Sequence, residues 1–155
     1  MTPPEPPASE HATLRALRGW LLAIVFVGIV GTGIELLLLG HYADSAQAAP
    51  LVLLAAGLAA TLWHAAAPVA ASVRALQFVM VLFVSSGLVG IGYHYAGNEA
   101  AVLETLPPAD GTALLLEAMV GASPLLAPGS MVLLGLVGLV HAYRHPLLAG
   151  RGLGI

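Results

Sequence analysis

The chain has 155 residues, of which 59% are hydrophobic and 8% are charged, and its net charge at pH 7 is −3. Soluble domains carry about 25% charged residues, so this composition indicates an integral membrane protein. The chain contains no cysteine, which excludes disulfides, thiolate zinc sites and iron–sulfur clusters, and its negative charge argues against nucleic-acid binding.

The predicted organisation is a membrane domain between two short tails. Residues 1–13 are expected to form an extended, disordered tail, because four prolines lie within the first seven positions. The membrane domain is predicted over residues 14–148, and residues 149–155 form the C-terminal tail. Four apolar stretches in this domain approach the roughly 20 residues that a helix needs to cross a bilayer. The predicted spans are residues 19–39, 50–67, 75–95 and 125–143.

Prolines mark boundaries between the predicted helices. Pro50 is expected as the first residue of the second span, where its missing N–H donor does no harm. Pro107 and Pro108 break the long outer connection, which runs over residues 96–124. After this break, residues 112–120 are predicted to form a short helix in the outer interface.

Arginines set the predicted orientation, since Lys and Arg near helix ends stay predominantly cytoplasmic. One orientation places every basic residue on the cytoplasmic side: Arg15, Arg18, Arg74, Arg144 and Arg151. The predicted fold class is therefore an all-α integral membrane protein, a four-transmembrane-helix bundle with both termini in the cytoplasm. The absence of lysine and the abundance of Ala, Leu and Gly suggest a bacterial inner (plasma) membrane.

A cleaved signal peptide is the alternative interpretation of the first apolar stretch. The core of a signal peptide has about 7–15 residues. The first span is longer than this and contains Glu35, so we favour a retained membrane helix.

Four ionisable residues lie within the predicted spans, where each costs about 2.5 kcal/mol or more. They are Glu35, His64, His94 and His141. Each is preceded on its helix face by Gly, Ala or Thr, and small residues line helix contacts in membranes. All four side chains are therefore expected to point into the bundle.

One candidate metal site lies at the outer ends of the first and third spans. Glu35, His41, His94 and Glu99, with Asp44 nearby, provide ligands that suit zinc, iron or manganese. The same set can bind copper(II), relay protons, or have a purely structural role. No His-x-x-x-His or Glu-x-x-His spacing occurs among these four residues, so the set carries no recognised motif.

A second candidate site lies at the inner ends of the second and fourth spans. His64 and His141 are two histidines at one depth on different helices, as bis-His ligation of haem b in a bundle requires. The alternative places both rings in the headgroup region without a ligand. His11 and His145 are assigned to the tails and given no role. No serine or glycine pattern indicates a catalytic site, so the chain is not expected to be an enzyme.

Three functions are compatible with these features. The first hypothesis is a non-catalytic accessory or assembly component of a membrane complex, whose partners are lipids and either other membrane proteins or further copies of the chain. The second is a metal- or haem-binding membrane protein that uses one of the two sites. The third is an oligomeric small transporter or proton-coupled channel.

Overall fold

The computed structural model describes residues 8–105, 111–121 and 126–149. These ranges contain six helices and no strand. The helices are α1 (Ala8–Leu38), α2 (Ser45–Ala66), α3 (Ala70–Thr105), α4 (Gly111–Val120), α5 (Leu126–Ala142) and α6 (Pro146–Ala149). The all-helical class predicted from the sequence is confirmed.

Three of the described helices, α1, α2 and α3, are long and apolar enough to cross a membrane. Helices suit the bilayer because they satisfy their backbone hydrogen bonds internally. α5 is also apolar, but its 17 residues give a length of about 25 Å, slightly less than the ~30 Å bilayer core. Large apolar side chains such as Val27, Val52, Phe78 and Leu133 are exposed on all four helices. The chain is thus a multi-pass membrane protein whose apolar helices face lipid.

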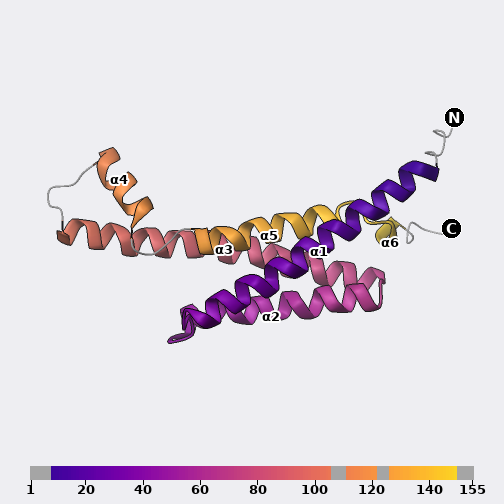
Figure 1. Cartoon of the computed structure of the whole chain (residues 1–155), viewed down its shortest axis with the longest axis horizontal. Coiled ribbons are helices and arrows are strands. Elements are labelled where there is room, and N and C mark those ends of the chain that lie inside the picture. Colours follow the sequence, from indigo (N-terminus) through magenta and orange to yellow (C-terminus); the bar gives the residue numbers. More distant parts are fainter. Residues whose placement is uncertain (1–7, 106–110, 122–125, 150–155) are drawn as a thin grey trace, which may run out of the picture.

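α1, α2, α3 and α5 form a ring in which each helix contacts the next. α3 and α5 make the most extensive contact and run side by side, while α1 crosses α5 obliquely (Figure 1). Among the described residues, the backbones of α2 and α5 make no contact, because these helices are opposite members of the ring. Side chains of α2 and α5 therefore meet only inside the bundle.

A layer of apolar side chains fills the middle of this ring. Val25 and Ile29 of α1, Leu54 of α2, Phe83 of α3 and Leu134 of α5 are all buried. This layer separates the end of the bundle that holds the α1–α2 turn from the end that holds the α2–α3 turn.

Glycines allow α3 and α5 to approach closely. A Cβ atom added to Gly87 would lie 2.7 Å from the carbonyl oxygen of Pro128, and one added to Gly135 would lie 2.7 Å from the carbonyl oxygen of Met80. Both colliding atoms belong to the backbone, so no change of side-chain rotamer relieves the collision. Small residues therefore set the distance between α3 and α5, as is common in membrane bundles.

Two helices extend beyond their predicted ends. α1 begins at Ala8, inside the predicted 1–13 tail, because residues 8–18 contain neither glycine nor proline and favour a helix. α3 continues to Thr105, well past the predicted end at residue 95, because the first helix-breaking proline after that point is Pro107.

α2 begins at Ser45, so the prediction that Pro50 starts this helix is wrong. The side chain of Asp44 accepts a hydrogen bond from the Gln47 N–H (2.9 Å), and Gln47 Oε1 accepts one from the Ala43 N–H (3.1 Å). This reciprocal pair caps the helix N-terminus. Pro50 consequently lies inside the helix, in its second turn.

The short helix predicted over residues 112–120 is confirmed as α4. It folds back over the C-terminal part of α3 (Figure 1). Asn98 Nδ2 donates a hydrogen bond to the carbonyl of Ala118 (2.9 Å), which holds α4 in this position.

Replacing Gly135 with alanine is expected to destabilise the bundle by about 1–3 kcal/mol, because the added methyl group pushes α3 away from α5. The unfolding midpoint of the protein in detergent micelles measures this effect. Gly92→Ala on α3 is the matched control, since nothing lies within 4 Å of a Cβ atom added there. The control midpoint should be unchanged or slightly higher, because alanine favours a helix. Equal losses in the two variants would contradict the close α3–α5 contact.

Candidate metal centre

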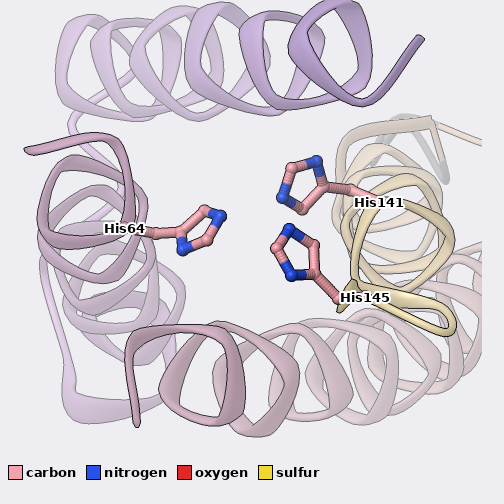
Figure 2. Close-up of side chains that lie close together, drawn as sticks. All are labelled: His64, His141 and His145. Atoms are coloured by element: carbon pink, nitrogen blue, oxygen red, sulfur yellow. The ribbon is translucent and has the colours of Figure 1, made fainter. Parts of the chain in front are cut away.

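Three histidines meet inside one end of the bundle. His64 comes from the last turn of α2, His141 from the last turn of α5, and His145 from the turn that follows α5. Figure 2 shows their rings pointing toward one another, His64 from one side and the other two from the opposite side. The three residues are 5%, 3% and 8% exposed, so the cluster is shielded from solvent.

The rings are close enough to share one ion. The ring centroids lie 5.2 Å apart for His64 and His141, 5.3 Å for His64 and His145, and 5.6 Å for His141 and His145. One potential ligand atom from each residue lies within 4.8 Å of those from the other two. A tetrahedral ion with metal–nitrogen bonds of about 2.0–2.1 Å holds its nitrogens about 3.4 Å apart. Small side-chain movements therefore bring the three nitrogens to ligand distance.

Ser72 orients the ring of His64. The Ser72 hydroxyl, in the first turn of α3, lies 2.8 Å from the Val69 carbonyl oxygen and 3.1 Å from that of Ala67. Ser72 Oγ also forms a 3.0 Å hydrogen bond with Nδ1 of His64, and Nδ1–H is the donor when the hydroxyl proton goes to one of these carbonyls. In that tautomer Nε2 of His64 carries the lone pair, and the start of α3 fixes the direction of the ring.

α1 orients the ring of His141. Nδ1–H of His141 donates to the backbone carbonyl of Arg18, at 2.9 Å. Nε2 of His141 carries the lone pair, and among the described residues this buried atom has no hydrogen-bond partner. Metal-binding histidines usually donate their second ring N–H in this way, which fixes the tautomer and raises the basicity of the ligand.

A tight turn brings His145 back toward His141. Arg144 adopts a left-handed conformation (φ 44°), and the N–H of His145 donates to the Ala142 carbonyl (3.2 Å). The Arg18 guanidinium donates to the carbonyls of Tyr143 (3.4 Å) and Arg144 (3.3 Å), so α1 also holds the turn. Nδ1 of His145 accepts a longer bond from the Leu147 N–H, at 3.3 Å.

Burial, together with the neighbouring basic groups of His64, His141 and Arg18, lowers the pKa of His145 to about 4, so this ring is neutral at physiological pH. Among the described residues, the cluster contains imidazoles alone, with neither a carboxylate nor a thiolate. The site therefore offers uncharged nitrogen donors and no negative charge.

The sequence predicted two of these three residues. His64 and His141 lie together inside one end of the bundle. Their helices, α2 and α5, are opposite members of the ring and do not pack against each other. His145 was assigned to a tail without a role. A signal for it exists, because His141 and His145 have the His-x-x-x-His spacing that is common in metal sites. The two histidines do not share one helix, because α5 ends at Ala142 and the following turn brings His145 back toward His141.

The predicted outer set is brought together only in part. The rings of His41 and His94 lie 6.4 Å apart, and both residues line a cavity with Asp44. Glu99 is partly buried but does not line this cavity. Glu35 is exposed, so its expected inward direction is wrong. The next residue, Leu36, lies on the buried face of α1. Because adjacent residues of a helix point about 100° apart, Glu35 points away from that face.

Comparison with known proteins does not identify the chain. No protein family, curated protein or solved structure matches it.

Without a bound metal, the protein is expected to lose stability as the pH falls from about 6.5 toward 4. Because the folded state holds the pKa of His145 near 4, the unfolded chain takes up more protons throughout this range. Unfolding midpoints at pH 7 and pH 5, measured with chelator present, test this. His145→Gln should reduce the loss, whereas His11→Gln on the exposed start of α1 should leave it unchanged. An unaltered loss in His145→Gln would show that another group causes it.

Proposed function

We propose that this protein binds one transition-metal ion with His64, His141 and His145. The observation that carries the proposal is the convergence of three buried imidazoles, including a Nε2 atom of His141 that has no partner among the described residues. A buried polar atom without a partner costs about 1–3 kcal/mol. An ion at the centre of the cluster satisfies this atom and both neighbouring rings together.

Protonation gives a poorer explanation for the cluster. Two or three imidazolium ions at these distances repel one another, and burial disfavours every charged ring. Simple packing is also unfavourable, because an apolar core filled by aliphatic side chains avoids the cost of the unpaired nitrogen. Binding by an ion is the use of the cluster that removes both penalties.

The donor set points to a borderline metal ion. Imidazole suits zinc, copper, iron and nickel, whereas magnesium and calcium prefer oxygen ligands. Three protein ligands leave a fourth position for water or another molecule, the arrangement of catalytic and exchangeable zinc sites. The ring separation of 5.2 Å between His64 and His141 favours a single ion over haem b, since His145 occupies the space beside them.

Binding through Nε2 makes a specific demand on His145. A neutral ring whose Nδ1 accepts a hydrogen bond carries its proton on Nε2. His145 must therefore give up the 3.3 Å bond from the Leu147 N–H before its Nε2 can bind an ion. Nδ1 of His141 already donates to the Arg18 carbonyl, and Nδ1 of His64 is already engaged by Ser72, so these two residues form the fixed part of the site.

We infer that α5 is a fourth membrane span and that both termini are cytoplasmic, in a bacterial inner membrane. α1 begins, and α6 lies, at the same end of the molecule as the α2–α3 turn (Figure 1). The four arginines among the described residues, Arg15, Arg18, Arg74 and Arg144, flank this end, as the positive-inside rule expects for the cytoplasmic side. The proposed metal site then lies at the cytoplasmic end of the bundle.

This site suits the accessory role suggested by the sequence. The described helices form one bundle with α4 beside it. Among the accessory roles, we therefore favour a component that holds a metal ion within a larger membrane complex. The buried layer around Leu54, Phe83 and Leu134 separates the two ends of the bundle. This layer supports metal holding over metal conduction, the transport alternative.

Protein purified in mild detergent without chelator is expected to contain about one transition-metal ion per chain. His145→Ala should lower the affinity for Zn²⁺ at least tenfold, because two ligands hold the ion in place of three. Elemental mass spectrometry gives the stoichiometry and competition with a chromogenic chelator gives the affinity. His11→Ala is the matched control and should bind like the wild type. Absence of zinc, copper, iron and nickel, with no binding of added ions, would overturn the proposal.

The topology can be tested with single cysteines, because the natural chain has none. Tyr42→Cys in the α1–α2 turn and Glu104→Cys near the end of α3 should react with an impermeant maleimide on intact spheroplasts. Ala71→Cys and Ala149→Cys should react only after the membrane is permeabilised. Labelling of Glu104→Cys and Ala149→Cys from the same side would show that α5 does not cross the membrane.

A further inference from the structure

The opposite end of the bundle contains a cavity that the metal proposal does not use. It has a volume of about 470 Å³, within the range of small-molecule sites, and it lies where α1, α2, α3 and α5 meet near the α1–α2 turn. His94 on α3 lines it, and the buried Nδ1 atom of His94 has no hydrogen-bond partner among the described residues. The two buried side-chain atoms that lack partners in the described chain therefore mark the two ends of the bundle.

The cavity is lined by both apolar and polar residues. Leu36 and Met131, which are 7% and 2% exposed, are the buried residues of its lining, and Pro128 is partly buried. His41 is half-buried and Asp44 is exposed where the lining reaches the α1–α2 turn. A ligand with an apolar body and hydrogen-bonding atoms at one side matches this arrangement.

The charges of the lining residues restrict the ligand further. No lysine or arginine lines the cavity, and Asp44 contributes a carboxylate, so an anionic head group is disfavoured. Asp44 already accepts the Gln47 N–H as the cap of α2, and the lining also presents the Ser86 hydroxyl and the imidazoles of His41 and His94. Each neutral imidazole can donate one hydrogen bond and accept another. The ligand is therefore a neutral molecule with oxygen atoms that exchange hydrogen bonds with His41 and His94.

A metal ion fits this end poorly. The group of three metal-ligand side chains found in the described residues is His64, His141 and His145, and His41, His94 and Asp44 are not drawn together in the same way. The rings of His41 and His94 lie 6.4 Å apart beside an open volume. This separation leaves room for an organic molecule against both rings.

We propose that the outer cavity binds a quinone head group, with its ring against Leu36, Met131 and Pro128 and its oxygens hydrogen-bonded to His94 and His41. A quinone is neutral and planar, it dissolves in the membrane that surrounds the cavity, and it carries oxygens that accept hydrogen bonds from imidazole N–H groups. A benzoquinone ring with small substituents fits within the 470 Å³ volume. This inference is independent of the metal at the other end.

The test uses the full chain in lipid nanodiscs and the water-soluble quinone 2,3-dimethoxy-5-methyl-1,4-benzoquinone, titrated by calorimetry. The absence of cysteine and lysine removes the side chains to which a quinone most readily adds covalently. We expect saturable binding of one molecule per chain. His94→Ala should weaken it about tenfold, as expected for the loss of one buried hydrogen bond.

Two controls separate a specific site from general effects. His11→Ala, on the exposed start of α1 and outside both sites, should bind the quinone like the wild type. If His94→Ala does not fold, His94→Asn keeps a donor and an acceptor and should retain measurable binding, while His41→Ala should weaken it. Empty nanodiscs correct for partition into lipid.

Several outcomes overturn the proposal. These are absence of saturable binding, equal affinity in wild type and both cavity variants, and preferential binding of Zn²⁺ or inorganic phosphate in place of the quinone. Loss of quinone binding in His64→Ala with no loss in His94→Ala would also overturn it, because the site would then lie at the other end.

Discussion

The close contact between α3 and α5 is the constraint on which the rest of the bundle depends. Gly87 and Gly135 allow the two backbones to meet directly, so α5 runs flush along α3. α1 and α2 then close the ring on the other side, which places α2 opposite α5. The C-terminal ends of α2 and α5 consequently face each other across the bundle. The histidines in these last turns therefore share the space inside it.

Hydrogen bonds to residues outside the cluster hold the histidine rings in their orientations. Nδ1 of His64 is hydrogen-bonded to the Ser72 hydroxyl at the start of α3, and Nδ1–H of His141 donates to the Arg18 carbonyl of α1. The same arginine holds the turn that carries His145. Three different elements therefore position the three rings from outside the cluster, and His145 alone must exchange its present hydrogen bond before Nε2 can bind an ion.

The sequence predicts the helices and the inner histidine pair better than it predicts the complete sites. Apolar length and arginine placement indicate the membrane helices, because lipid imposes these properties on each segment separately. The role of His145 depends on the left-handed turn at Arg144, which hydropathy does not indicate. The exposure of Glu35 depends on the rotation of α1. Glycine spacing predicted the wrong face, because nothing lies within 4 Å of a Cβ atom added to Gly31 and this glycine is not at a close helix contact. The structure was thus needed for the features that depend on how several helices pack together.

Histidines lie at both ends of the bundle, but their surroundings differ and suit different ligands. At the inner end a turn adds a third imidazole to a pair already 5.2 Å apart, which leaves space for an ion. At the outer end the pair is 6.4 Å apart, no third imidazole joins it among the described residues, and buried apolar side chains contribute to the lining of the remaining volume. The buried apolar layer lies between the two ends. The metal site and the organic-ligand site that we propose therefore differ in what the chain places beside each pair of imidazoles.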